Sequence, residues 1–570
     1  MSVFTPEPSM TRPVSEIDVI VLGSGAAGLA AAVTAAHFGL KVLVLEKTEL
    51  VGGTTAWSGG WIWAPCNPLA IRRGIDESPT QVAQYLQSVL GPYYDAARIE
   101  TFLDTSPKMV HFFEQHTCLQ FDPDHGIPDT YSHKPHAGLG GRSVIAKPIN
   151  GRELGNAIHL LRPPLRETTL HGLMVQAGAD LKAFLTCLQN WQSFKHVTRR
   201  LIRFGFERIR YGRSLDLRNG NALVGRLLKS AIEAGVEIRT NTTVRRLIRH
   251  DDRITAVELD DSQINVTRGV VLACGGFSHD LVRRNALFRQ GSKHHSLSVP
   301  SATGDGLRLS ELVGAHIQTA VAQPAAYCPV SIVPWPDQQP GVFPHIIDRG
   351  KPGVIAVLRS GQRFCNEGLG YHDVVEKLLA ATAPDQSPEA WLICDHHFLR
   401  RYGFGIVRPR PLPYRHWIRR DYLQSAVTIA ALADQIGIAR CALEHTVTTY
   451  NVHAARGEDP EFGRGETAYM RLQGDPSITP NPCVAPIVTP PFYALRIVAG
   501  HFGTFAGIKT TPKGQVLDVA GHPIRGLYAA GSDQASVFGG FYPAGGINLG
   551  PALTFGYLAG YELAQLQEIV

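Results

Sequence analysis

The sequence predicts an α/β protein in which a Rossmann-like parallel sheet is interrupted by an inserted α+β domain. The first observation is an apolar, β-branched run at 17–22 that leads into a Gly-x-Gly-x-x-Gly turn and an Ala-rich helix. The second is a return to buried, glycine-ended runs at 269–276 and 526–532. The third is length, since 570 residues exceed what one hydrophobic core normally holds.

The turn after the first strand has the features of a dinucleotide site. Gly23 allows a tight turn, Gly25 lets the backbone approach a pyrophosphate, and Gly28 lets helix and strand pack closely. The helix N-terminus offers free N–H groups and a positive dipole end to phosphates. A second strand ends in Glu46, whose carboxylate suits ribose hydroxyls. An ordinary glycine-rich βα turn is the alternative, but all five features agree on a dinucleotide.

A second small-residue loop, 52–60, indicates which dinucleotide is bound. A nicotinamide enzyme does not need such a loop, whereas FAD does, because its flavin reaches far from the adenine. Alone, the loop is equally compatible with an unremarkable turn. We therefore predict FAD, held in the N-terminal part by Gly23, Ser24, Gly25, Ala26, Ala27, Gly28, Glu46, Lys47, Gly53, Thr54, Thr55, Ser58, Gly59 and Gly60.

Composition excludes several other classes of protein. The formal charge of +6 is small for this length, and no groove-reading motif accompanies it, so we expect no nucleic-acid partner. The nine cysteines contain no C-x-x-C pair, which argues against a zinc or iron–sulfur site. Their odd number, with no signal peptide, favours reduced thiols and a cytoplasmic location. No apolar run reaches the length of a membrane span.

The next elements are two helices and an unusual insert. We expect helices at 78–90, capped by Ser78 with Pro79 at its first position, and at 96–116, followed by a loop at 121–141. Residues 160–213 form a basic helical insert, with helical spacing at 181–191. Its basic residues are Lys195, His196, Arg199, Arg200, Arg203, Arg208, Arg210 and Arg213, and apolar Val197, Leu201, Ile202, Phe204, Phe206 and Ile209 lie between them.

Two interpretations of the insert stay open. Basic residues beside an apolar face are typical of a helix on an anionic membrane surface, which predicts peripheral contact through 195–213 at the inner face of the membrane. The alternative is a solvated helix face or an oligomer contact.

The remainder predicts the domain organisation. A helix at 223–234, a strand at 236–240 and a hairpin of 244–249 with 254–259 precede the buried strand 269–276, and we place Val244, Ala273 and Gly275 at the cofactor. An inserted substrate domain then includes helices at 423–436 and 443–455 and ends in a proline-rich linker at 473–491. The predicted FAD-binding domain thus comprises 16–300 and 491–570, and the substrate domain 301–490.

The C-terminal segment supplies a second glycine-rich site. A strand at 526–532 ends in glycine, and the run 539–552 leads into an apolar helix. Amides near Gly546 would lie at that helix start, which suits a flavin pyrimidine edge or an oxyanion. We therefore add Gly531, Ser532, Gly546, Ile547 and Leu549 to the cofactor-binding residues.

Together these motifs resemble the flavin-dependent 3-ketosteroid dehydrogenases, relatives of the fumarate reductase flavoproteins. The resemblance runs nearly end to end. It depends on Gly23-Ser24-Gly25, Leu45-Glu46-Lys47, Gly52-Gly53-Thr54-Thr55, Arg363-Phe364-Cys365-Asn366-Glu367 with Tyr371, Leu527-Tyr528-Ala529-Ala530-Gly531, and Tyr542-Pro543 with Gly546. The sequence Tyr542-Pro543-Ala544-Gly545-Gly546 is the part that points to the steroid enzymes.

The resemblance implies oxidation of a 3-keto-4-ene steroid at C1–C2. It assigns Tyr542 and the Gly546 amide to the C3 ketone oxygen and Tyr371 to the C2 proton, with the C1 hydride passing to flavin N5. A quinone or other acceptor would then reoxidise the flavin. The family often has a Pro-Asp-Tyr-Tyr context for a supporting tyrosine. Here Pro128-Asp129 is followed by Thr130 and then Tyr131, which leaves two alternatives: Tyr131 takes that role, or the relay is absent.

Two other reactions remain open from the sequence. The same fold could oxidise the C4–C5 bond of a 5α-steroid, since only positioning over the flavin distinguishes the two. Reduction of a fumarate-like alkene is a different class. His501 lies close to where fumarate reductases keep a substrate-binding histidine, but the register differs. Those enzymes also need an arginine acid in the C-terminal segment, and 541–543 supplies none.

Overall fold

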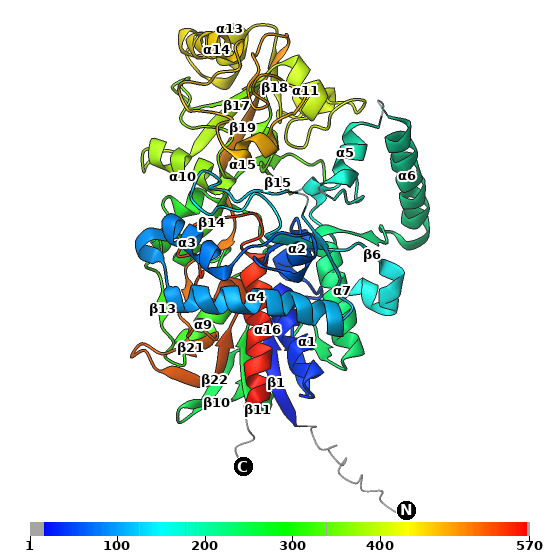
Figure 1. Cartoon of the computed structure of the whole chain (residues 1–570), viewed down its shortest axis with the longest axis vertical. Coiled ribbons are helices and arrows are strands. Elements are labelled where there is room, and N and C mark those ends of the chain that lie inside the picture. The colour runs from blue at the N-terminus through cyan, green and yellow to red at the C-terminus, as the bar shows by residue number, and fades with distance from the viewer. Residues whose placement is uncertain (1–15, 125, 177, 188–189, 338, 567–570) are drawn as a thin grey trace, which may run out of the picture.

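Two β-sheets, one mostly parallel and one antiparallel, organise the chain (Figure 1). The computed structural model describes residues 16–566, except 125, 177, 188–189 and 338. The first sheet has a parallel core in the order β8-β2-β1-β11-β22. Its strands are β1 (Ile17–Leu22), β2 (Val42–Leu45), β8 (Glu237–Arg239), β11 (Gln263–Leu272) and β22 (Pro523–Ala529). This is the Rossmann-like sheet that the sequence predicts, and the mixed α/β fold class is confirmed.

Helix α1 (Ala26–His37) and helix α16 (Leu549–Gln565) pack closely against each other beside this sheet (Figure 1). Small residues make the approach possible, since a Cβ at Gly556 would lie 2.4 Å from the Ala27 carbonyl oxygen and one at Gly560 2.5 Å from that of Ala31. The N-terminal and C-terminal segments of the first domain therefore share one core, and α7 (Asn219–Glu233) packs on the other side of α1.

The second sheet lies in the upper half of Figure 1 and has the order β15-β14-β19-β17-β16. Its antiparallel strands are β14 (Ala325–Val333), β15 (Gly341–Pro344), β16 (Val354–Val357), β17 (Glu389–Cys394) and β19 (Phe492–Thr504), and the short β12 (His295–Ser296) and β18 (Gln424–Ala426) also pair with β19. Because β19 follows the proline-rich stretch and pairs with β14 and β17, the second sheet continues to Thr504. This pairing favours a later return to the first domain than the predicted residue 491.

Several local predictions correspond to observed elements. The predicted helix at 78–90 is α3 (Pro79–Leu90), where Ser78 and Gln81 form a capping box, and the next is α4 (Ala96–His116). The helix expected at 423–436 is wrong in its first half. Residues Gln424–Ala426 pair with β19 as β18, and only then does Thr428 cap α13 (Ile429–Ile436). The loop expected at 121–141 begins with a short strand, β4 (Phe121–Pro123), because it pairs with β5 (Ser143–Ala146).

The basic insert contains two helices on the outer right side of Figure 1. These are α5 (Ala179–Leu185) and α6 (Trp191–Tyr211), so the helical spacing at 181–191 covers two elements. The break occurs where the Asn190 side chain accepts from the Gln192 N–H and caps α6. In the described part of the chain, no helix combines the length and apolarity needed to cross a bilayer.

The remaining elements are shorter or peripheral. They are α2 (Pro68–Arg72), α8 (Leu281–Leu287), α9 (Asp305–Glu311), α10 (Tyr371–Ala381), α11 (His396–Tyr402), α12 (Arg415–Arg419), α14 (Arg440–Ala454), α15 (Ala468–Gln473), β3 (Trp61–Trp63), β6 (Ile149–Asn150), β7 (Asp216–Leu217), β9 (Arg246–His250), β10 (Arg253–Glu258), β13 (Ile317–Gln318), β20 (Gly507–Ile508) and β21 (Gln515–Leu517). Strands β9 and β10 form the predicted hairpin.

Candidate active site

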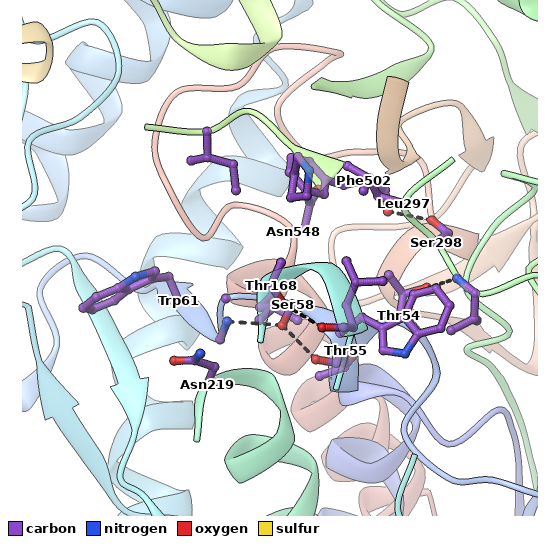
Figure 2. Close-up of a pocket in the computed structure, with 18 of the residues that line it drawn as sticks. Thr54, Thr55, Ser58, Trp61, Thr168, Asn219, Leu297, Ser298, Phe502 and Asn548 are labelled. Carbon is purple, nitrogen blue, oxygen red and sulfur yellow. Dashed lines mark hydrogen bonds between the residues drawn. The ribbon is translucent and has the colours of Figure 1, made fainter. Parts of the chain in front are cut away.

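A cavity of about 1070 Å³ runs between the two sheets and the basic insert. One end is lined by the glycine-rich turn after β1 and by the loop 53–60. The other end is lined by Tyr371, Tyr542 and Phe502. Figure 2 shows side chains of this lining, which come from segments far apart in the sequence.

The glycine-rich end has the backbone geometry that a dinucleotide needs. A Cβ at Gly23 would lie 2.3 Å from the Ala273 carbonyl oxygen, and one at Gly28 would lie 1.9 Å from the Gly23 carbonyl oxygen. Side chains are therefore excluded at both positions, and the N-terminus of α1 faces the cavity through Gly25 and Ala26. The residues present fit a pyrophosphate at a helix N-terminus.

The acidic residue at the end of β2 is buried and fixed. Its Oε2 accepts from the Ser24 N–H and hydroxyl, and its Oε1 accepts from the Thr48 N–H and hydroxyl. A carboxylate has about four lone-pair sites in all, and these four bonds occupy them, so Glu46, which lines the cavity, would accept from a ribose hydroxyl only by giving up or sharing one of these bonds. The neighbouring Lys47 pairs with Asp305 of α9.

The loop 53–60 connects the turn to the segment that follows β12. The Thr55 hydroxyl accepts from the Ala26 N–H at 3.0 Å, and the Thr54 hydroxyl accepts from the Val299 N–H at 3.1 Å. The Ser58 hydroxyl donates to the Thr55 carbonyl at 2.8 Å and accepts from the Gly60 N–H, as Figure 2 shows. The loop is thus held as a preformed wall of the cavity.

The structure brings together most of the predicted site residues. Those that line the cavity are Gly23, Ser24, Gly25, Ala26, Ala27, Glu46, Lys47, Gly53, Thr54, Thr55, Ser58, Gly59, Gly60, Val244, Ala273, Gly275, Tyr371, Gly531, Ser532, Tyr542, Gly546 and Leu549. Three predicted residues lie outside the lining. Gly28 packs under the turn, Ile547 is buried in the core, and the Tyr131 hydroxyl points to Asp373.

Two tyrosines meet at the other end of the cavity. The ring centroids of Tyr371 and Tyr542 lie 4.9 Å apart, edge to face, and Phe502 packs edge-on against Tyr371 at 5.6 Å. The Asn548 amide donates to the Tyr542 hydroxyl at 3.2 Å. Burial raises the pKa of Tyr371 well above its usual value, with further contributions from Tyr542 and Tyr469, and burial also raises the pKa of Tyr542.

Gly546 lies beside this pair in a conformation that requires glycine. Its φ is +101°, and a Cβ there would lie 2.7 Å from the Trp63 nitrogen. Its carbonyl accepts from the Trp63 N–H at 3.1 Å and from the Gly550 N–H at 2.9 Å. The carbonyl is therefore turned toward β3 and α16, while the residue itself lines the cavity.

Tyr131 belongs to a separate buried network. Its hydroxyl donates to Asp373 Oδ1 at 2.8 Å. Asp373 lies in the first turn of α10, and burial raises its pKa to about 7, an effect that the Tyr131 hydrogen bond opposes. Thr130 instead anchors the active-site loop, since its N–H donates to the Pro543 carbonyl at 2.9 Å.

The motif around Arg363 positions α10. Glu367 accepts from Arg363, Arg464 and the Ala356 N–H, and Arg363 also pairs with Asp459. This ion-pair network is almost fully buried. It fixes the turn that leads into Tyr371, the first residue of α10.

Sequence reasoning missed several lining residues. Asn548, Tyr469 and Lys351 line the cavity, as does Phe502. Asn548 could have been predicted as a lining residue, since it follows Gly546 by two residues at a helix start. The others reach the cavity only through contacts between distant parts of the chain. The buried His501 is absent from the cavity lining and packs against Phe288 and His294.

Comparisons with known proteins agree on one family. The FAD binding domain model matches residues 18–549. The chain is 39% identical to a 4-oxocyclohex-2-ene-1-carboxylate 5-dehydrogenase of Sinomonas cyclohexanicum, over 96% of this chain and 94% of that protein. It is 34% identical to a 3-oxosteroid 1-dehydrogenase of Mycobacterium tuberculosis, over 97% of this chain and 99% of that protein.

A solved structure shares the same architecture. The 3-ketosteroid Δ1-dehydrogenase of Sterolibacterium denitrificans, in complex with 1,4-androstadiene-3,17-dione, superposes with a TM-score of 0.88 at 32% identity, covering 97% of this chain and 100% of that one. The predicted resemblance to this family and the predicted FAD cofactor are therefore confirmed. The chain belongs to the FAD binding domain family that includes these dehydrogenases, and it is an FAD-dependent oxidoreductase that dehydrogenates a CH–CH bond.

Proposed function

We propose that this enzyme introduces a double bond beside the ketone of a cyclic oxo-compound, with a 3-keto-4-ene steroid, oxidised at C1–C2, as the first candidate. The observation that carries the proposal is that Tyr371, Tyr542 and Gly546 line one end of the same cavity as the dinucleotide turn. FAD, when bound, supplies the acceptor for the hydride that leaves the substrate.

Tyr542 and Gly546 are proposed to hold the ketone oxygen. The Tyr542 hydroxyl accepts from Asn548, and this leaves its own proton to donate to the ketone. The raised pKa of Tyr542 keeps that proton in place at neutral pH. The Gly546 N–H would be the second donor, and two donors stabilise the negative charge that develops on the oxygen as the neighbouring C–H bond breaks.

Tyr371 is proposed to take the proton from the carbon beside the ketone. The ring centroids of Tyr371 and Tyr542 lie 4.9 Å apart, so a ketone held by Tyr542 would place its α-carbon near Tyr371. Burial disfavours the Tyr371 phenolate and raises the pKa of Tyr371. Two neighbouring tyrosines and a cysteine raise this pKa further. Tyr371 can therefore take the proton only after its own hydroxyl proton has left, and the small phenolate fraction at neutral pH limits this step.

The size and lining of the cavity support a polycyclic substrate. Beyond the tyrosines it continues to apolar residues of the insert and of the segment 402–412, including Leu165, Leu181, Phe184 and Leu412. A single six-membered ring would leave this extension unfilled. The proposal is also supported by similarity over almost the whole chain to two 3-oxosteroid dehydrogenases.

A monocyclic oxo-acid is the second candidate, and one residue favours it. Lys351 lines the cavity, and its ammonium donates to the Gly474 carbonyl at 2.7 Å, which leaves two of its three N–H donors for a carboxylate. Burial lowers the pKa of Lys351, and a bound carboxylate would oppose that shift. The 39% identical relative is named for a ring ketone of this kind that carries a carboxylate.

Parallel assays separate these candidates. We expect purified FAD-loaded enzyme to reduce an artificial acceptor with 4-androstene-3,17-dione while dienone absorbance grows. Turnover of 5α-saturated ketones alone would indicate C4–C5 oxidation, and turnover of fumarate with a reduced dye would indicate an alkene reductase.

A lysine variant tests the second candidate. Lys351→Met is expected to raise KM for 4-oxocyclohex-2-ene-1-carboxylate by about tenfold, the loss of one charge-assisted contact, and to leave KM for the steroid unchanged. Arg359→Gln, an exposed cation that is absent from the cavity lining, is the matched control. Equal effects of Lys351→Met on both substrates would exclude Lys351 as a carboxylate site.

A further inference from the structure

Helix α6 has two opposite faces, one toward the protein and one toward solvent. Toward the protein, Val197, Arg200, Phe204 and Glu207 follow each other at three- and four-residue spacing, and all are buried or half-buried. The cations on this side are neutralised, since Arg200 pairs with Asp180 of α5 and with Asp216, and Arg203 pairs with Glu207 at 2.7 Å.

The outward face combines exposed apolar side chains with unpaired cations. Trp191 is 75% exposed, Ile202 70% and Ile209 90%, and Phe206 is also exposed. Lys195 and Arg199 continue the row 195, 199, 202, 206 and 209 along the same side of the helix. Among the described residues, Lys195, Arg199 and Arg210 take part in no ion pair with a carboxylate, whereas Arg208 lies on the protein side and donates to the His171 carbonyl.

Helix α6 lies beside the apolar rim of the cavity. The lining residues Leu201, Ile347, Leu412 and Leu472 are each more than a third exposed, and they mark where the cavity meets solvent. Leu201 belongs to α6 itself, and Leu181 and Phe184 of α5 also line the cavity. In Figure 1, α6 forms the outer edge of the molecule on this side.

We propose that α6 docks on an anionic lipid surface, with its apolar side chains in the headgroup region and its cations on lipid phosphates. A helix whose exposed face combines basic and apolar residues, and whose one acidic residue is buried, has the pattern of an interfacial helix. A second copy of this chain is a poorer occupant, because it would bring the same cations into contact. An acidic protein would satisfy the cations but would not account for the exposed Trp191, Ile202 and Ile209 beside an apolar rim.

Docking would place the rim of the cavity at the lipid surface. This consequence depends on the proposed apolar substrate, but the docking itself does not. A steroid dissolved in the lipid would then enter past Leu201 without crossing water. Vesicle binding measured without turnover therefore tests the surface independently of the reaction.

The experiment uses full-length, FAD-loaded enzyme and vesicles of phosphatidylcholine with or without phosphatidylglycerol, at about 150 mM salt. We expect binding to the anionic vesicles only, weakened at high salt. The charge variant Lys195→Gln/Arg199→Gln/Arg210→Gln and the apolar variant Ile202→Ser/Phe206→Ser/Ile209→Ser should each weaken it by about tenfold or more. The matched control, Arg239→Gln/Arg245→Gln/Arg359→Gln, removes three exposed arginines elsewhere and should bind as wild type.

Three results would overturn the proposal. One is failure of the intact enzyme to bind anionic vesicles, and another is equal loss in the control. The third is binding to polyglutamate as strong as to vesicles and insensitive to the apolar variant, which would identify an acidic polypeptide as the occupant. Flavin absorbance and activity on a water-soluble ring ketone establish that each variant is folded.

Discussion

At the scale of single residues, the proposed chemistry depends on two tyrosine hydroxyls that burial keeps protonated. Tyr542 and Tyr371 are both buried, and the pKa of each is raised. The sequence predicted both residues through a family motif, yet it could not predict Asn548 as the donor to Tyr542, because that contact depends on how the chain turns into α16. It also could not predict that Tyr131 would hydrogen-bond to Asp373.

Removal of the Tyr542 hydroxyl tests the proposed oxyanion donor. We expect Tyr542→Phe to lower kcat by roughly a hundredfold or more, with a smaller change in KM, because one donor to a developing oxyanion is lost. Steady-state kinetics with the preferred ketone measure it. Tyr528→Phe, a buried tyrosine on β22, is the control, and unchanged kcat in Tyr542→Phe would reject the role.

The raised pKa of Tyr371 predicts a pH profile. The phenolate fraction grows as pH approaches that pKa from below, so log kcat/KM should rise from about pH 7 to about pH 10 without a plateau. The Asp373→Asn variant should keep this rise, since the pKa of Asp373 is about 7. A plateau reached near neutral pH in the wild type and lost in Tyr371→Phe would show that Tyr371 has a lowered pKa in the working enzyme.

Asp373 predicts a pH effect on stability. Burial raises its pKa from 3.8 to about 7, so between these values the folded protein retains a proton that the unfolded chain releases. Stability from this group is therefore greatest below about pH 4 and falls as pH rises to 7, by at most roughly 1.4 kcal/mol per pH unit. Thermal melting should show a shallower decline in Asp373→Asn, whereas the exposed Asp104→Asn should match the wild type.

At the scale of elements, local sequence signals predicted the first helices and strands of the chain well. The capping box of α3 and the turn from β1 to α1 are encoded by neighbouring residues. The strand β18 was missed because its residues have no strand pattern and are fixed only by pairing with β19. Pairing between distant strands likewise assigns β19 to the second sheet, which the proline-rich stretch before it did not indicate.

The network that positions α10 predicts a large loss of stability. Glu367→Gln would leave the buried guanidinium groups of Arg363 and Arg464 without one of their counter-charges. Breaking a buried pair by removing one partner typically costs 3–5 kcal/mol, so we expect roughly that decrease in the free energy of unfolding. Chemical denaturation measures it, with the exposed Glu458→Gln as control. A loss below about 1 kcal/mol would contradict the structural role of the network.

At the scale of the whole molecule, the two sheets and the insert each supply one part of a single cavity. The Rossmann-like half and its cofactor could be predicted because their glycines are constrained by backbone geometry that recurs in unrelated proteins. The substrate end could be predicted only by resemblance to a family. Its apolar extension toward α5 and α6 was not foreseen, because helices far apart in sequence from Tyr371 form it.

The packing of α16 on α1 has a consequence for how the enzyme matures. The turn after β1 is among the first described parts of the chain, whereas Gly531, Gly546 and Leu549 come more than five hundred residues after it begins. A nascent polypeptide that has not yet emerged from the ribosome as far as Leu549 lacks one wall of the flavin site. Flavin loading must therefore follow synthesis at least as far as Leu549, and truncation before residue 531 should yield a colourless product.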